Sequence, residues 1–207
     1  TLQGVVAVPV TVEANGGEKG EPRCVLVGLP DTAVKESLDR ILSSLANSGY
    51  SRPRTRVTIN LAPGDLRKEG VAFDLPIALC LLASTGQLPE NSLQDFLIAG
   101  ELALSGETRS IKGGLSMAML AQKHGKKGVL LPATSAAEAS LLGGIDVFSI
   151  GSLGEAVAFF KGEHPRIPLD SKKYQFADSP DHYEEVDFSE VKGQANVRRA
   201  VEVAVAG

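Results

Sequence analysis

A loop at residues 64–73 carries residue types and a spacing that could support chemistry. Four charged residues, Asp65, Arg67, Lys68 and Glu69, lie between two glycines, and an apolar segment with helical character follows the loop. Loops held between rigid elements often carry function, and the free N–H groups at a helix start can hold a bound or reacting anion. Where an active site of this design would have its nucleophile, however, the loop has Ala72.

A purely structural interpretation of the same loop is also open. Asp74 can cap the helix that follows, and the charges at residues 67–69 can be solvated turn charges. The glycines can supply backbone angles that other residues avoid. The elements around the loop are therefore needed to decide between the two interpretations.

Patterns of apolar residues predict these elements along most of the chain. Strands are expected at residues 4–13, 23–27, 56–61, 100–104, 107–111, 128–131 and 147–150. Helices are expected at residues 32–47, 75–83, 115–124, 134–142 and 153–160. Strands that alternate with helices at these lengths predict an α+β fold of α/β layers, in which the helices cover a sheet.

The first part of the chain supports more local expectations. Asn15-Gly16-Gly17 predicts a turn that joins the first two strands in a hairpin. Asp31 is placed to cap the helix at residues 32–47. The charged residues on the outer face of that helix, spaced by four, are expected to be solvated: Lys35, Glu36, Asp39 and Arg40.

Composition excludes several classes of protein. The chain has 207 residues, of which 43% are hydrophobic, so it can bury a substantial core and is not disordered. A net charge of -4 argues against a dedicated basic nucleic-acid module but permits a local basic patch. No signal-peptide pattern is present, and the longest apolar run, residues 77–83, is too short to span a bilayer. We expect a cytoplasmic protein without a membrane partner, and a piece of a longer chain, because the sequence ends within an apolar pattern.

The cysteines and histidines do not form a recognisable site. Cys24 and Cys80 lie far apart with no metal-ligand spacing around them, and we expect both to be buried and reduced. The histidines, His124, His164 and His182, are also separated from one another. They show neither a metal pattern nor a catalytic triad, so we expect exposed histidines and no metal site.

Three segments follow one another in an order that resembles the proteolytic domain of Lon. They are Lys68-Glu69-Gly70 after a strand, a hairpin at residues 100–106, and Ile111-Lys112-Gly113-Gly114-Leu115 at a helix start. In Lon a Lys-Asp-Gly-Pro-Ser-Ala-Gly loop holds the serine nucleophile, and a Gly-Gly-Leu-x-x-Lys helix supplies the general base. The resemblance implies a Lon-like fold, also described as the ribosomal protein S5 domain 2-like fold.

The same resemblance argues against peptidase activity. Ala72 falls on the serine position of Lon, and Ala118 falls on the lysine position. A methyl group can neither attack a carbonyl nor accept the proton of a hydroxyl group. A serine peptidase with a relocated dyad, formed by Ser116 and Lys112, stays open as an alternative.

A closer resemblance covers nearly the whole chain. Its motifs are Gly-Leu-Pro-Asp-Thr-Ala-Val-Lys-Glu-Ser at residues 28–37, Ile-Asn-Leu-Ala-Pro-Gly-Asp-Leu-Arg-Lys-Glu-Gly at residues 59–70 and Phe-Asp-Leu-Pro-Ile-Ala at residues 73–78. Together they resemble the bacterial YifB/ComM family of magnesium-chelatase-like competence proteins. The resemblance implies a Lon-like domain at residues 1–161, followed by an AAA+ ATPase module in a hexameric motor that drives DNA branch migration during natural transformation. A magnesium-chelatase ATPase subunit is the alternative within the same resemblance.

The end of the chain resembles the entry into such a module. Residues 162–187 are rich in proline and charge without periodicity, which predicts a linker, and residues 188–207 would begin the AAA+ module. In the intact module Val191 and Gly193 are implied to lie beside the adenine. No Gly-x-x-x-x-Gly-Lys-Ser/Thr pattern occurs in the 207 residues, so ATP and Mg²⁺ are expected in the full-length protein and not in this part of it.

Two groups of basic residues could contact DNA. Arg52, Arg54 and Arg56 alternate, so on an extended segment they would project from one face. Lys123, Lys126 and Lys127 cluster after a predicted helix. Either group could meet phosphates, although both are compatible with ordinary solvated charge.

Overall fold

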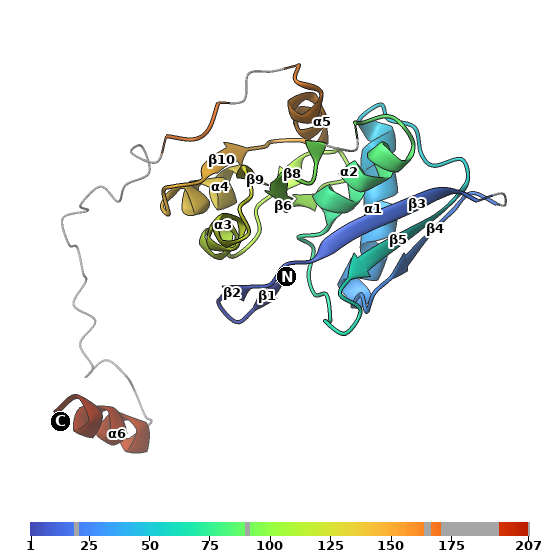
Figure 1. Cartoon of the computed structure of the whole chain (residues 1–207). Helices are drawn as coiled ribbons and strands as arrows, with labels where there is room; N and C mark the ends of the chain where they lie inside the picture. The colour runs from blue at the N-terminus through green and yellow to red at the C-terminus, as the bar shows by residue number, and fades with distance from the viewer. Residues whose placement is uncertain (19–20, 90–91, 164–166, 171–194, 207) are drawn as a thin grey trace. The chain divides into compact units, whose positions relative to one another are not determined.

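The computed structural model describes residues 1–18, 21–89, 92–163, 167–170 and 195–206. The chain divides into two compact units, residues 1–175 and residues 176–207. The second unit is described only as the helix α6, Ala195–Ala206. Every other element belongs to the first unit, which is a mixed α/β structure (Figure 1).

The first sheet contains β3 (Thr11–Glu18), β5 (Arg56–Ala62) and β4 (Arg23–Val27), in that order. Strand β5 lies in the middle, antiparallel to β3 and parallel to β4. The predicted hairpin between the first two strands is therefore wrong. Its predicted turn lies inside β3, where a shift in register between Gly16 and Glu18 accommodates the glycines. Alternate residues of β5 are fully buried, and such a strand takes the central place with a partner on each side.

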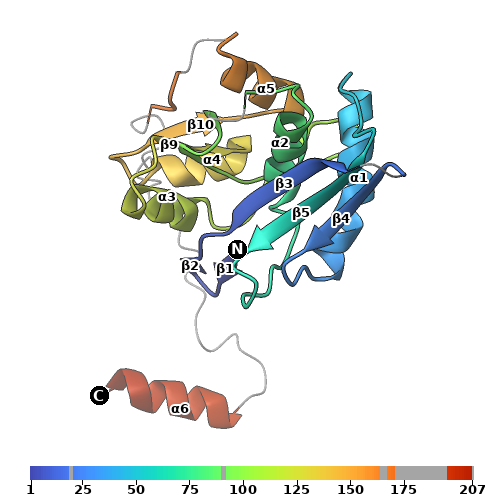
Figure 2. The same ribbon diagram turned by 45° about the vertical axis from the view of Figure 1, so that its right-hand side comes forward.

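Helix α1 (Thr32–Asn47) connects β4 to β5 and has the predicted bounds. As predicted, Asp31 caps it, with its carboxylate accepting a hydrogen bond from the Val34 N–H at 2.8 Å. The apolar face of α1 packs against the same face of the first sheet as helix α2 (Asp74–Ser84), as Figure 2 shows. Helix α2 is buried on most of its circumference, which agrees with its nearly continuous apolar sequence.

The second sheet is parallel, with the order β10 (Asp146–Ser149), β9 (Gly128–Leu131) and β6 (Phe96–Ile98). Helices α3 (Gly114–Lys123) and α4 (Ala133–Ser140) share an apolar cluster with one face of this sheet. Helices α2 and α5 (Leu153–Lys161) share the main core with the other face. Four phenylalanines meet edge to face in that core: Phe96, Phe148, Phe159 and Phe160.

Two short hairpins complete the first unit. Strands β7 (Glu101–Leu102) and β8 (Thr108–Arg109) pair antiparallel at the predicted hairpin, although each strand is shorter than predicted. Strands β1 (Leu2–Gln3) and β2 (Val6–Ala7) also pair antiparallel. The single strand predicted at residues 4–13 is therefore wrong, because Gly4 adopts a positive φ of 59° and turns the chain between β1 and β2. None of the described helices is both long and apolar enough to cross a membrane.

Candidate functional site

The loop that connects β5 to α2 encloses a lysine. The Lys68 N–H donates to the Leu29 carbonyl at 3.1 Å, and the Lys68 carbonyl accepts from the Asp31 N–H at 3.0 Å. These two backbone bonds fix the residue beside the segment that precedes α1. Its side chain is 0% exposed, and Nζ donates to the Pro63 carbonyl. The interpretation of Lys68 as a solvated turn charge is therefore wrong.

Burial has an electrostatic consequence for Lys68. Removing an ammonium group from water disfavours its charged form, and this lowers the pKa of Lys68 below its ordinary value. The nearby Asp65 carboxylate opposes that change. The neighbouring charges behave as predicted, because Arg67 and Glu69 form an ion pair at 3.1 Å in which the side chains are 73% and 61% exposed.

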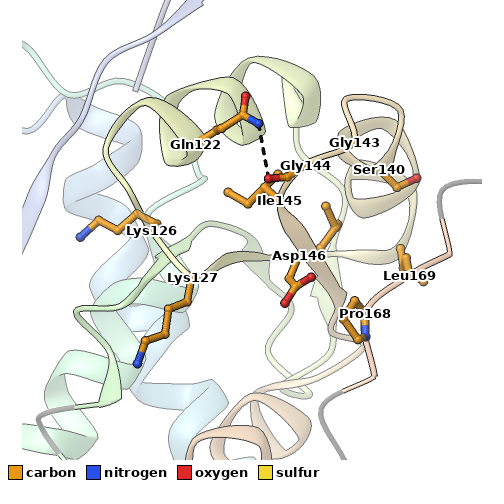
Figure 3. Close-up of a pocket in the computed structure, with 11 residues that line it drawn as sticks. Gln122, Lys126, Lys127, Ser140, Gly143, Gly144, Ile145, Asp146, Pro168 and Leu169 are labelled. Atoms are coloured by element: carbon orange, nitrogen blue, oxygen red, sulfur yellow. Dashed lines mark hydrogen bonds between the residues drawn. The ribbon is translucent and has the colours of Figure 1, made fainter.

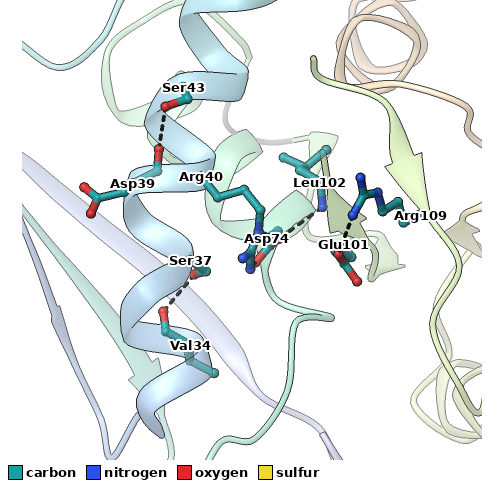
Figure 4. A network of polar contacts seen from close by, with 9 residues as sticks. All are labelled: Val34, Ser37, Asp39, Arg40, Ser43, Asp74, Glu101, Leu102 and Arg109. Carbon is teal, nitrogen blue, oxygen red and sulfur yellow. Dashed lines mark hydrogen bonds and ion pairs between the residues drawn. The ribbon is translucent and has the colours of Figure 1, made fainter. Parts of the chain in front are cut away.

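Asp74 does not cap α2 with its side chain, which corrects the prediction. The residue at the cap position is Phe73, and Asp74 is the first residue of the helix. Its carboxylate accepts two hydrogen bonds from Arg40, at 2.7 and 3.0 Å, and a third from the Leu102 N–H at 3.1 Å (Figure 4). Asp74 thus joins α2 to α1 and to β7.

The same contacts correct the expected position of Arg40. The side chain of Arg40 is 24% exposed, so it does not belong to a fully solvated helix face. The hydrogen bond with Asp74 raises the pKa of Arg40. Burial raises the pKa of the Asp74 carboxyl group, and the bonds from Arg40 and Leu102 oppose that rise. Three donors on one carboxylate favour its charged form and so oppose the effect of burial.

Ala72 and Ala118 lie in one apolar cluster. Ala118 is 0% exposed, and Ala72 is partly buried against the same cluster. The Ala72 carbonyl accepts a hydrogen bond from the Gly100 N–H at 3.0 Å, which places it just beyond the end of β6. Neither alanine carries a group that could take part in acid–base or nucleophilic chemistry.

Ser116 and Lys112 are not joined by any described hydrogen bond. The Ser116 hydroxyl group donates instead to the Val5 carbonyl at 2.6 Å and holds the β1–β2 hairpin against α3. Lys112 is exposed.

The start of α3 is filled by a carboxylate from α4. Glu138 accepts hydrogen bonds from the Gly114 N–H at 3.1 Å and the Leu115 N–H at 3.2 Å. Gly114 allows this close approach, because a Cβ at that position would lie 2.2 Å from the Ser135 carbonyl oxygen. These N–H groups are used within the protein and do not fit a nucleotide phosphate.

A groove of about 710 Å³ begins at Ala72 and runs beside β6. Its lining includes the consecutive residues 7–12 and 96–99, one face of α2 and one face of α3. The lining residues on α3 and at its C-cap are spaced as on one side of a helix: Met117, Leu120, Ala121 and His124. That spacing is visible in the sequence, but it equally indicates a face packed in the core, so the groove was not predicted.

A second hollow, of about 490 Å³, lies at the other edge of the second sheet (Figure 3). Gly143 and Gly144, both with positive φ, and the segment at Pro168 and Leu169 contribute to its wall. The Leu169 N–H donates to the Val147 carbonyl at 2.8 Å, which attaches this segment to β10. Its lining also includes Lys126 and Lys127, two of the lysines predicted to contact DNA, together with Asp146.

The remaining predicted residues are spread over the surface. Arg52, Arg54 and Arg56 are exposed, but Arg52 donates to the Leu42 carbonyl at 3.0 Å and the chain bends at Arg54, so they do not lie on one extended segment. Lys123, Lys126 and Lys127 are also exposed. Lys126 donates to the Gln94 carbonyl at 2.7 Å, and Lys127 pairs with Asp95 at 2.6 Å.

Other predictions concern single residues. Cys24 and Cys80 are half-buried thiols, so the expected burial is only partial. Burial raises the pKa of the Cys24 thiol. His124 is exposed as predicted, at the rim of the groove. His164, His182, Val191 and Gly193 lie outside the described residues. In the described part of the chain no cluster of potential metal ligands occurs.

Comparison with known proteins gives three relevant findings. A family model described as subunit ChlI of Mg-chelatase matches residues 12–135. The chain is 41% identical over 204 residues to the uncharacterized protein YifB of Escherichia coli, which covers 99% of this chain and 39% of that protein. It is 37% identical over 205 residues to the competence protein ComM of Haemophilus influenzae, which covers 99% of this chain and 40% of ComM.

A more distant similarity extends over two thirds of the chain. The DNA repair protein RadA of Escherichia coli is 27% identical over 140 residues, which cover 67% of this chain and 29% of RadA. The chain spans 39% and 40% of the lengths of YifB and ComM. These relatives therefore extend well beyond the part that this chain matches.

Proposed function

The chain belongs to the family of subunit ChlI of Mg-chelatase, with YifB and ComM among its relatives, and we propose that it is a non-catalytic domain of a DNA-acting AAA+ ATPase. The complete protein would be a cytoplasmic hexamer that uses ATP and Mg²⁺ to drive branch migration of DNA during natural transformation. In that motor the present domain would serve assembly or the handling of DNA.

The observation that carries this proposal is the similarity to ComM along 99% of the chain. The name of ComM refers to competence, the uptake of DNA, and the name of the more distant relative RadA refers to DNA repair. Two relatives named for DNA metabolism favour a DNA substrate over a peptide substrate.

A Lon-like fold without peptidase activity is part of the proposal. It is supported by the order of β5, the Lys68 loop, α2, the β7–β8 hairpin and α3. It is also supported by the apolar surroundings of Ala72 and Ala118. Residues 1–161 would form this domain, residues 162–187 the linker and residues 188–207 the start of the AAA+ module.

The nucleotide would bind outside the first unit. Glu138 already fills the glycine-rich start of α3, and no P-loop pattern occurs in the 207 residues. Val191 and Gly193 are proposed to contact the adenine in the complete module.

Assembly of the complete protein tests the proposal. Sedimentation with a non-hydrolysable ATP analogue should give a hexamer, whereas a protein that stays monomeric at saturating nucleotide would contradict it. A fluorophosphonate probe should leave the protein unlabelled. Labelling that is abolished by Ser116→Ala would support the alternative of a serine peptidase with a relocated dyad.

One observation favours a second function, that of a magnesium-chelatase ATPase subunit. The family model named for subunit ChlI matches residues 12–135, which lie within the proposed Lon-like domain itself. This second function requires partner chelatase subunits, because the ATPase would drive metal insertion by another chain. Pull-downs with the full-length protein should recover no chelatase partner if the DNA motor is correct.

A further inference from the structure

We propose that the outer edge of β4 is a dimer interface, at which β4 of one copy of the chain pairs antiparallel with β4 of a second copy. The two-fold axis would pass beside Val25, and the two three-stranded sheets would form one continuous sheet. This dimer is independent of the hexamer proposed above, because it requires neither nucleotide nor an ATPase module.

Strand β4 has a neighbour on one side only. It is the terminal strand of the first sheet, and its residues, Arg23–Val27, pair in parallel with β5. Figures 1 and 2 both show it at the outer side of that sheet. In the part of the chain that the structure describes, no backbone hydrogen bond of residues 23–27 leads to a group outside β5. The outward N–H and C=O groups of β4 are therefore open to another strand.

The sequence of β4 does not protect this edge. Exposed strand edges of soluble proteins are usually protected by charged residues, prolines or bulges. Between Arg23 and Gly28, however, the strand has only Cys-Val-Leu-Val, and its register with β5 is regular. Val27 is 40% exposed, and Leu29, just beyond the strand, is 55% exposed. An apolar edge without protection, next to exposed apolar side chains, indicates a strand partner.

A second copy of the same strand complements this edge. Cys24 and Leu26 pack against the core, so Val25 and its alternate neighbours project from the other face of the sheet. About the two-fold axis, Arg23 of each copy would lie beside Val27 of the other, and its methylene groups could cover that valine. The ladder would contain about four to six backbone hydrogen bonds. The edge is thus self-complementary, as a two-fold contact requires.

Helix α1 would extend the interface behind the strands. Helix α2 lies on the β3 side, since the Cys80 thiol donates to the Val12 carbonyl at 3.6 Å, and α1 lies behind β5 and β4 in Figures 1 and 2. Arg40 bonds to Asp74 of α2, so the opposite flank of α1 points beyond β4. That flank carries residues spaced by four: Leu38, Leu42 and Ala46. In the dimer the same flank of a second α1 would face them.

The two ends of this surface differ in charge. Arg52 contacts the Leu42 carbonyl in the second half of α1, near the start of β4. This end carries two arginines and one glutamate: Arg23, Arg52 and Glu21. The other end, where β4 ends and α1 begins, carries two aspartates and one lysine: Asp31, Asp39 and Lys35. An antiparallel pair places each end against the opposite end of the second copy, so net charges of opposite sign meet.

Sedimentation velocity on the chain of residues 1–207 tests the proposal. A dilution series should show a monomer–dimer equilibrium. Val25→Lys should raise the dimer dissociation constant at least tenfold, because two lysines would lie opposite each other at the axis. A chain that remains monomeric at millimolar concentration, or a dimer that Val25→Lys leaves unchanged, would overturn the proposal.

The matched control is Thr58→Lys. Thr58 is the register partner of Val25 and projects from the same face, but it lies on the central strand and not at the edge. It should change the dissociation constant less than threefold, and circular dichroism would verify that both variants fold. Equal weakening by the two variants would overturn the assignment to the β4 edge.

A mixture of charge variants tests the antiparallel register. Val25→Asp alone should weaken the dimer as Val25→Lys does. Mixed in equal amounts, the two variants should associate at least tenfold more tightly than either alone, because lysine then faces aspartate. A mixture that associates no more tightly than the single variants would overturn a two-fold axis beside Val25.

Helix α6 provides a competing surface in the same experiment. It exposes apolar side chains, among them Val197, Val201 and Val203. Val201→Lys should leave the dissociation constant unchanged. A dimer that is lost in Val201→Lys and kept in Val25→Lys would overturn the proposal in favour of pairing through α6.

Discussion

Lys68 is a charged residue in a buried environment, whereas a lysine in a loop is usually exposed to solvent. A charge in a surface loop is normally solvated, so no sequence signal distinguishes Lys68 from its neighbours Arg67 and Glu69. Its burial follows from backbone bonds to Leu29 and Asp31, which are distant in sequence. The loop was predicted from its glycines and its strand, but the position of this side chain depends on tertiary contacts.

Burial of Lys68 predicts a specific dependence of stability on pH. Between its lowered folded pKa and the ordinary lysine value of 10.5, the unfolded chain binds more protons than the folded chain. The free energy of unfolding of the wild type should therefore rise with pH in this window, relative to Lys68→Met, by at most about 1.4 kcal/mol per pH unit. Urea denaturation at several pH values measures it.

The control for this experiment is Lys112→Met, which removes an exposed lysine. Its stability should run parallel to that of the wild type at every pH. Parallel curves for Lys68→Met as well would show that the Lys68 amine is solvated in the folded protein.

The ion pair of Arg40 and Asp74 makes a second prediction at the same scale. Arg40→Met leaves the fully buried Asp74 carboxylate with only the Leu102 N–H as a donor, and this should lower the free energy of unfolding by about 3 kcal/mol. The matched variant Arg67→Met, in an exposed pair, should change it by less than about 0.5 kcal/mol. Urea denaturation compares the two, and similar small effects would mean that the Arg40 pair is not buried in solution.

At the scale of elements, local signals predicted helices better than strand pairing. The bounds of α1 were predicted because its cap at Asp31 and its apolar periodicity are both local. The order of the strands in the first sheet was not predicted. Strand β5 pairs with both β3 and β4, and the chain reaches this central place only after the crossover through α1. The groove was missed for the same reason, since its walls come from segments far apart in the chain.

The start of α3 gives a prediction about one element. Glu138→Ala would leave the Gly114 and Leu115 N–H groups without their carboxylate partner. The free energy of unfolding should fall by about 1–2 kcal/mol, as expected for the loss of charged acceptors at a helix N-terminus. Thermal and urea unfolding provide the measurement.

Glu107→Ala is the matched control, because the Glu107 side chain is exposed and no described hydrogen bond uses its carboxylate. It should leave stability nearly unchanged. An equal loss in both variants would contradict the capping role of Glu138.

A further prediction concerns the cluster that contains Ala118. Ala118→Lys would place an amine at a position that is 0% exposed, and burial of an unpaired charge should destabilise the fold by several kcal/mol, on the order of 3 or more. Met119→Lys, at a neighbouring position that is 54% exposed, should be tolerated. The melting temperature should fall clearly for Ala118→Lys and little for Met119→Lys. A stable Ala118→Lys protein would contradict this and would show that this part of α3 accepts a catalytic amine.

At the scale of the whole molecule, the described part of the chain is chiefly one mixed α/β unit, and the relatives of the chain extend far beyond the part that it matches. Membership in the ChlI family and the similarity to ComM account for the sequence from end to end. A peptidase is not needed to explain the loop at Lys68, since the Lys68 backbone and the Gly70 N–H bond it to the segment that precedes α1.

Branch migration by the complete protein tests this account most directly. The complete protein proposed above should convert a fluorescently labelled four-way DNA junction to duplex products in an ATP-dependent reaction. ATP hydrolysis should rise several-fold when branched DNA is added. A complete protein that hydrolyses ATP at the same rate with and without branched DNA, and leaves the junction intact, would contradict the account.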